Sequence, residues 1–293
     1  MRDLKTERNK TLRLEDGRSL GYGIYGDADG QAIFYFHGFP GSRLEAQLAD
    51  RVAAQLGVRL IAVDRPGFGL SDFKPHRVIL DWPDDVIKIA DALGINRFAT
   101  VGVSGGGPYV AACALRIPER LTAAAIVSGL GPLDAPKGTD RMIRNNHLIF
   151  LLGRRLPWLA RILLWRMAYQ VRRNPERVLG RIMSTLPDVD KAVLARPKVK
   201  AAITDNLFEA FRRGSSGTTY ELLLYSRPWG FSLKDIAVPV DLWHGEEDRS
   251  VPPTMGRYQA TAIPQCHATF CPHEGHFSLA INHMEEILSR LVK

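Results

Sequence analysis

The sequence predicts an α/β fold in which a mostly parallel, twisted sheet carries helices on both faces and a helical lid is inserted. Short apolar runs, typical of strands covered on both faces, alternate with helical patterns on both sides of residues 134–230. That middle segment shows helical patterns only. Because the sheet needs strands from both sides of the insertion, we expect one domain formed by residues 1–133 and 231–293, with 134–230 as its lid.

The elements before the insertion follow one another along the chain. A hairpin is expected at 11–14 and 19–25, because the turn between these runs contains Asp16-Gly17. Asp81 is expected to cap a helix, and Pro83 falls in its first turn, where a missing N–H does no harm. The further expected strands are 32–37, 59–63, 97–103 and 121–128, and the expected helices are 43–56, 82–93 and 108–116.

The insertion differs from the rest of the chain in charge. It contains 18 Lys and Arg against 8 Asp and Glu, which leaves 21 basic and 23 acidic residues elsewhere. The net charge of +8 therefore arises in this segment. Prolines at 157, 175, 187 and 197 divide it into helical stretches. After it, strands are expected at 238–243 and 267–270, with helices at 255–261 and at the end of the chain to residue 292.

Two apolar segments of the lid, 148–152 and 158–165, are interleaved with arginines. We expect most of their apolar side chains to pack the lid onto the domain; any that line a pocket would suit a hydrophobic acyl or aryl group. The arginines could attract an anionic substrate or rest on an anionic membrane surface. A solvated basic face is the favoured interpretation.

The most informative motif is Gly102-Val103-Ser104-Gly105-Gly106, which follows an apolar run and precedes a helical pattern. A strand that turns sharply into a helix needs small residues two positions before and after the serine, because side chains there would clash. The Ser104 hydroxyl would then stand clear at the end of the strand, with the Gly105 N–H pointing at the group under attack. The same letters also fit an ordinary glycine-rich turn, so the context decides.

Ser104, Asp248 and His276 occur in the order nucleophile, acid and histidine, each just after an expected strand. In an open parallel sheet, the loops at the carboxyl ends of the strands meet at one edge. In this order and placement, residues 11–292 resemble the α/β-hydrolase superfamily, in its lidded esterase, lipase, prolyl-aminopeptidase and epoxide-hydrolase-like branch. The resemblance implies that Ser104 is the nucleophile, that His276 is its base, and that Asp248 orients His276 and stabilises its cationic form.

The stretch His37-Gly38-Phe39-Pro40 resembles the oxyanion loop of that superfamily. The resemblance implies that the backbone N–H groups of Phe39 and Gly105 stabilise the negative oxygen of an acyl-transfer intermediate. His37 itself is expected to organise the loop. The loop at 64–69 also matches the superfamily, and we expect it to shape the chain beneath the site.

Each assigned residue has a competitor nearby in the sequence. His273 lies three positions before His276, but the Gly275-His276-Phe277 context ahead of the last helix favours His276. Asp248 competes with Glu246 and Glu247 in its own loop. It also competes with Asp134, which follows the preceding strand, where some relatives carry the acid. Asp248 is the favoured acid.

The predicted function is that of a serine hydrolase, most simply a carboxylesterase, which cleaves an ester, lactone or thioester through an acyl-enzyme on Ser104. Alternatives are an aminopeptidase or amidase, and an enzyme of the same fold with another chemistry: C–C cleavage, a lyase reaction such as cyanohydrin cleavage, or cofactor-free peroxidation. A non-catalytic ligand-binding protein would not need all three residues. A basic lid counts against peptidases that bind the substrate amine with lid carboxylates. Epoxide hydrolases and haloalkane dehalogenases of this fold attack with an aspartate. Ser104 stands at that position, which counts against both classes of enzyme.

No cofactor and no metal are expected. The glycines of 21–26 match Gly-x-Gly-x-x-Gly, but a polar turn and another strand follow them, whereas a dinucleotide site requires a helix. Cys266, His267, Cys271, His273 and His276 lie close together in the sequence, yet their spacing fits no common zinc site. Packing is the favoured role of the cysteines.

The composition suggests a cytoplasmic protein that acts on a small molecule. The N-terminus is charged and lacks the apolar region of a signal peptide, no apolar run could insert stably in a membrane, and three cysteines suit a reducing compartment. The positive charge comes without any nucleic-acid-binding motif, so no nucleic-acid partner is expected. The sequence predicts no particular oligomeric state.

Overall fold

The computed structural model describes residues 7–135 and 138–292 and contains a mostly parallel sheet. Its eight strands lie in the order β1-β2-β4-β3-β5-β6-β7-β8. The β1/β2 and β2/β4 pairs are antiparallel and every other pair is parallel. The strands are β1 Lys10–Arg13, β2 Ser19–Gly26, β3 Gln31–Phe36, β4 Val58–Val63, β5 Phe98–Val103, β6 Leu121–Val127, β7 Val240–Gly245 and β8 Cys266–Cys271. The predicted fold class is confirmed.

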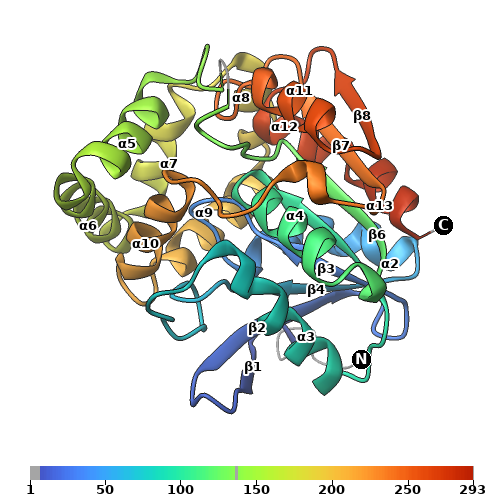
Figure 1. The fold of residues 1–293 in the computed structure, drawn as a ribbon. Helices are drawn as coiled ribbons and strands as arrows, with labels where there is room; N and C mark the ends of the chain where they lie inside the picture. The colour runs from blue at the N-terminus through green and yellow to red at the C-terminus, as the bar shows by residue number, and fades with distance from the viewer. Residues whose placement is uncertain (1–6, 136–137, 293) are drawn as a thin grey trace.

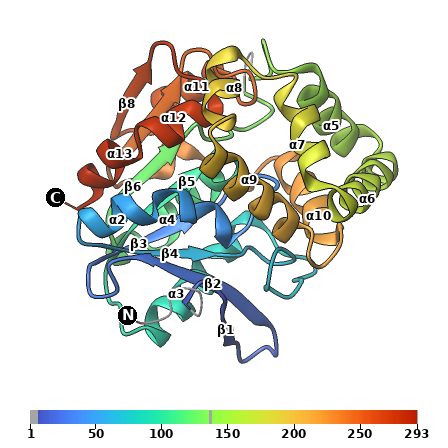
Figure 2. The same cartoon turned by 180° about the vertical axis from the view of Figure 1, so that it is seen from behind.

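Helices cover both faces of this sheet (Figures 1 and 2). One core joins the sheet to α3 (Trp82–Ala92), α4 (Gly107–Arg116) and α11 (Pro253–Ala262). The other joins it to α2 (Asp50–Gln55), α12 (His276–Asn282) and α13 (Met284–Leu291). The central strands β3 and β5 are buried on both faces, which explains their continuous apolar sequences.

The chain between β6 and β7 contains helices α5 to α10. They are α5 Arg144–Arg155, α6 Pro157–Arg173, α7 Pro175–Met183, α8 Asp188–Leu194, α9 Pro197–Ala210 and α10 Ser216–Tyr225. Three of the prolines that predicted helix breaks are the first residues of α6, α7 and α9, a position that needs no N–H donor. In both views α5 and α6 lie at the outer edge of the molecule, away from the sheet (Figures 1 and 2).

Several local predictions were wrong in detail. The expected helix at 43–56 is a 3₁₀ segment, η1 (Arg43–Ala49), followed by α2. The Asp81 carboxylate accepts the N–H of Val78 and does not cap α3, since a short 3₁₀ turn, η2 (Ile79–Asp81), precedes that helix. The terminal helix is broken at His283. The remaining 3₁₀ turns are η3 Ser104–Gly106, η4 Pro118–Arg120 and η5 Leu233–Asp235.

The expectation that the apolar residues of the insertion pack inward holds for only some of them. Leu164 and Ala168 of α6 are buried, whereas the side chains of Trp158 and Trp165 on the same helix are 62% and 60% exposed. None of the helices in the described part of the chain has the length and hydropathy needed to cross a bilayer.

Candidate active site

Ser104 lies at a sharp turn between β5 and α4. Its φ is +54°, a left-handed conformation that is costly for a residue with a side chain. The flanking glycines allow the turn. A Cβ at Gly102 would lie 2.5 Å from the carbonyl oxygen of Gly106, and one at Gly106 would lie 2.2 Å from the carbonyl oxygen of Phe36. Both positions therefore require glycine, as the motif predicted.

Asp248 and His276 come together at the ends of β7 and β8. His276 is the first residue of α12, and its Nδ1 lies 2.7 Å from Oδ2 of Asp248. The other oxygen, Oδ1, accepts the N–H groups of Ser250 and Val251, both at 2.8 Å, so the carboxylate is held in place. With Nδ1–H donated to Asp248, the neutral imidazole keeps Nε2 as an acceptor.

The surroundings of His276 favour its cationic form. Burial lowers the pKa of the imidazole, but Asp248 raises it by its charge and hydrogen bond, and Asp190 and Glu45 add to that effect. The net result is a pKa above the ordinary value of a histidine. Such an arrangement stabilises the imidazolium that forms when a histidine takes up a proton during a reaction.

The competing residues lie elsewhere. The side chain of His273 is 90% exposed and faces Glu247, 3.6 Å away. Glu246 forms a surface ion pair with Arg257. Asp134 is exposed in a turn after β6. Of the four candidate acids, Asp248 is the one that the structure brings to His276.

Ser104 and His276 line one cavity of about 400 Å³ between the sheet and the inserted helices. Within the described chain the Ser104 side chain makes no hydrogen bond, and no bond joins it to His276. A catalytic contact of this kind often tightens only when substrate binds. Most lining side chains are aliphatic or aromatic, among them Ile149, Phe150, Leu163, Leu164 and Met167.

The backbones of Phe39 and Gly105 lie side by side at the cavity wall. A Cβ at Gly105 would lie 2.7 Å from the Cβ of Phe39, so this glycine is needed for the close approach. The Phe39 N–H takes no part in the hydrogen bonds of the described loops, and the Gly105 N–H belongs to the first turn of a helix, where it has no intrahelical partner. Both donors are thus available to an oxygen in the cavity.

Glu45 is a half-buried cavity residue that the sequence did not single out. Its carboxylate accepts the N–H of Gly38 at 3.0 Å, the Tyr35 hydroxyl at 2.9 Å and the Asn206 amide at 3.2 Å. Burial raises the pKa of Glu45, and these hydrogen bonds oppose that rise. The contact to Gly38 fixes the loop that presents Phe39. No motif marks position 45. In the sequence, Glu45 looks like an ordinary surface acid of an expected helix.

Asp190 of α8 is a second residue that the sequence did not single out. It is fully buried and accepts three backbone N–H groups at the start of α12, those of His276, Phe277 and Ser278, at 3.0, 2.8 and 2.9 Å. A Cβ at Gly275 would lie 2.5 Å from Asp190, so the preceding glycine makes room for it. The inserted segment therefore holds the backbone of His276 directly.

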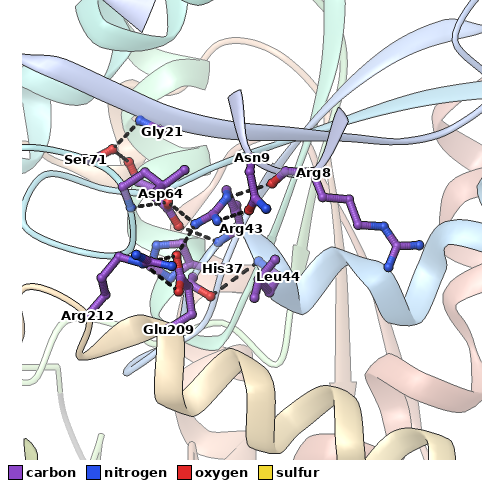
Figure 3. Close-up of polar contacts among 12 residues, drawn as sticks. Arg8, Asn9, Gly21, His37, Arg43, Leu44, Asp64, Ser71, Glu209 and Arg212 are labelled. Carbon is purple, nitrogen blue, oxygen red and sulfur yellow. Dashed lines mark hydrogen bonds and ion pairs between the residues drawn. The ribbon is translucent and has the colours of Figure 1, made fainter. Parts of the chain in front are cut away.

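The chain beneath the site is held by buried ion pairs. Figure 3 shows Arg43 between Asp64 and Glu209, with Nη1 at 2.8 and 2.6 Å from the two carboxylates. Arg65, which follows Asp64 in the sequence, donates a hydrogen bond to the carbonyl of Gly38 at 2.8 Å and forms an ion pair with Glu221 of α10. The loop at 64–69 thus has the shaping contacts that its sequence predicted.

In the described chain no group of three or more His, Cys, Asp or Glu side chains is arranged so that it could hold a metal ion, those near the C-terminus included. His37 is fully buried; its Nδ1 lies 2.8 Å from the carbonyl of Gly38, and its Nε2 accepts the N–H of Arg65 at 3.2 Å. Burial and the charge of Arg65 hold the pKa of His37 well below its ordinary value. These contacts fit the loop-organising role expected from the sequence.

Known proteins resemble this chain in sequence. A bifunctional esterase/perhydrolase of Acinetobacter calcoaceticus is 26% identical over 252 residues, which cover 82% of this chain and 83% of that protein. A non-heme chloroperoxidase of Streptomyces lividans is 30% identical over 132 residues, covering 44% of this chain and 48% of that protein.

Solved structures share the whole fold. An esterase from Rhodococcus superposes with a TM-score of 0.69 at 22% identity, covering 97% of this chain and 98% of that one. An α/β-hydrolase fold protein from Nakamurella multipartita gives a TM-score of 0.71 at 20% identity, with the same coverage. The family model of the alpha/beta hydrolase fold matches residues 31–282. The chain therefore belongs to the α/β-hydrolase fold family.

Proposed function

We propose that this protein is a serine hydrolase that cleaves a carboxylic ester, lactone or thioester. The family and the named relatives support a hydrolase of the α/β fold. The observation that carries the finer proposal is the 2.7 Å hydrogen bond between Asp248 and His276, beside a strained Ser104 on the wall of the same cavity. A serine hydroxyl needs such a base to become a nucleophile.

In the proposed reaction, Oγ of Ser104 bonds to the carbonyl carbon while Nε2 of His276 takes the hydroxyl proton. The oxygen of the carbonyl becomes negative and accepts the N–H groups of Phe39 and Gly105. The bond to the leaving group then breaks, and His276 returns the proton to the departing alcohol or thiol. Water, deprotonated by His276, next attacks the acyl-enzyme and releases the acid and Ser104. Asp248 stabilises the imidazolium in both halves.

The lining of the cavity supports a substrate with a hydrophobic acyl or aryl part. Among the lining residues that the structure describes there is no Lys or Arg, and the one carboxylate, Glu45, comes from the sheet domain. The inserted helices contribute no carboxylate to the described wall, so an aminopeptidase that binds its substrate amine with lid acids is disfavoured. We propose that residues 134–230 act as a lid whose inner face selects for this apolar part.

A fluorophosphonate probe tests the nucleophile, because it reacts with an activated serine and needs no knowledge of the substrate. We expect labelling of the wild-type protein and none of Ser104→Ala. A nearby serine offers the control: Ser128→Ala should still be labelled, because Ser128 does not line the cavity. A folded wild-type protein that resists the probe would overturn the hydrolase proposal.

Hydrolysis of short p-nitrophenyl esters tests the other two roles. His276→Ala should lose activity by three or more orders of magnitude, whereas His273→Ala should remain close to the wild type. Asp248→Asn should fall by orders of magnitude, and Asp134→Asn should not. The opposite outcome within either pair would move the role to the other residue. A panel of esters, lactones, thioesters and amides would then rank substrate classes.

A further inference from the structure

The outward face of α6 exposes a stripe of large apolar side chains. Trp158, Ile162, Trp165 and Tyr169 are 62%, 46%, 60% and 50% exposed. Their spacing of four, three and four residues places them in a sector of roughly 60° on a helix with 3.6 residues per turn. The rings of Trp165 and Tyr169 stack with their centroids 6.2 Å apart. We call these four residues the outer stripe. Exposed aromatic stripes of this kind mark contact surfaces.

Arginines border the outer stripe on both sides. At 3.6 residues per turn, Arg161 and Arg172 fall along one edge, and Arg166 and Arg173 along the other. Residues 144–173 contain seven arginines and no Asp or Glu. In the described part of the chain, none of these seven arginines forms an ion pair. The last basic residue before them that does so is Arg120, and the first after them is Lys191. The stripe is therefore apolar at its centre and carries uncompensated positive charge on its borders.

We propose that the outer stripe of α6 docks on the surface of an anionic phospholipid bilayer. Tryptophan, tyrosine and isoleucine side chains suit the boundary between headgroups and acyl chains, and arginines on both flanks would reach the lipid phosphates. A second copy of the chain is a poorer occupant, because a two-fold contact would bring two sets of unpaired arginines together. The bordering charge thus selects an anionic partner, and the exposed aromatic and aliphatic side chains select a lipid surface.

The placement of α6 adds a consequence. The opposite side of α5 and α6 lines the apolar cavity through Ile149, Phe150, Leu164 and Met167, while Leu163 both lines the cavity and is 39% exposed. In both views these two helices form the outer edge of the molecule (Figures 1 and 2). A docked bilayer would lie one helix away from the cavity. Access of lipid-derived acyl groups to Ser104 rests on the proposed function, whereas docking itself does not.

Cosedimentation with vesicles tests docking without any enzyme assay. The full chain should bind vesicles of phosphatidylglycerol and phosphatidylcholine, bind pure phosphatidylcholine far more weakly, and be released by high salt. Arg161→Gln/Arg166→Gln should lower the partition coefficient by roughly tenfold or more. Arg51→Gln/Lys234→Gln, which removes two exposed charges that lie on α2 and η5 and not on α5 or α6, is the matched control and should bind like the wild type.

Trp158→Ala/Trp165→Ala should lose binding to a similar degree, because it removes apolar area and leaves the charge intact. Circular dichroism and thermal unfolding confirm that each variant is folded; all four substituted residues lie outside the cavity lining. Equal binding to neutral and anionic vesicles would overturn the proposal, and so would binding that survives loss of the two arginines. Failure of the wild type to bind any vesicle, with a sedimentation-velocity dimer that Trp158→Ala/Trp165→Ala abolishes, would instead assign the stripe to self-association.

Discussion

Replacing Asp190 should weaken both the fold and the electrostatics of His276. Its buried carboxylate accepts the N–H groups of His276, Phe277 and Ser278. Deleting an ordinary helix cap costs about 1–2 kcal/mol, and a hydrogen bond to a charged group is worth about 1.5–3 kcal/mol. Some of the freed N–H groups would be rehydrated, so we expect Asp190→Ala to lower the free energy of unfolding by about 2–4 kcal/mol.

Asp190→Asn separates the charge from the shape. The amide keeps an acceptor oxygen, so its loss of stability should be smaller, about 1 kcal/mol. Asp190 raises the pKa of His276. Without that charge the imidazolium is less favoured, and the neutral imidazole persists to lower pH. The acid limb of kcat/KM for ester hydrolysis should therefore move to lower pH.

Urea unfolding measures the first effect, and NMR titration of the His276 imidazole measures the second without any substrate. Asp188→Asn is the control, because Asp188 lies on the same helix with its side chain 97% exposed. A surface pair such as Asp188 with Lys191 is screened by solvent, so its loss should change the stability little. A titration of His276 that is the same in wild type and Asp190→Asn would refute the reasoning, as would equal stability of Asp190→Ala and Asp188→Asn.

Two further predictions concern the turn and the ion pairs. Gly106→Ala should unfold the protein or cost more than about 3 kcal/mol, because its Cβ would lie 2.2 Å from a backbone oxygen of β3; Gly180→Ala, with open space around it, should be neutral or stabilising in thermal unfolding. Glu221→Gln should cost about 3–5 kcal/mol, because Arg65 loses a buried partner. Burial raises the pKa of Glu221, but the charges of its arginine partners outweigh this effect and bring the pKa down to about 2. The stabilisation that ionised Glu221 gives the folded state is therefore complete above the unfolded pKa of about 4.3 and is lost as the pH falls towards 2. Between these pH values, the free energy of unfolding of Glu221→Gln should depend less on pH than that of the wild type.

The sheet and the turn at Ser104 could be predicted because local chemistry determines them. A strand buried on both faces must be apolar along its length, and the turn demands glycine at two fixed positions whatever surrounds it. The expected strands differ from the observed ones by only one or two residues at their ends. The first half of the expected helix at 43–56 is the 3₁₀ segment η1, and its start is held by a partner 21 positions away, since Asp64 accepts the N–H of Arg43 at 2.6 Å.

The residues that support the site could not be predicted in the same way. Asp190 meets the backbone of His276 from 86 positions away, and Glu221 meets Arg65 from 156 positions away. An acid on a helix looks like a surface residue when its partner is that distant. The acid at 248 could be favoured because the superfamily order places it after a strand. The supporting acids have no such order, so only the packing of the inserted helices reveals them.

The distribution of charge in the insertion follows from these contacts. Three of its eight acidic residues, Asp190 of α8, Glu209 of α9 and Glu221 of α10, are buried against the sheet domain. Asp190 and Glu221 are bound by N–H groups and arginines of that domain, and Glu209 is shared between Arg43 of that domain and Arg212 of the insertion. The helices α8 to α10 are thereby anchored. The arginines of α5 and α6 are left without partners on the outside, which is why a segment fixed by its acids presents a basic face to its surroundings.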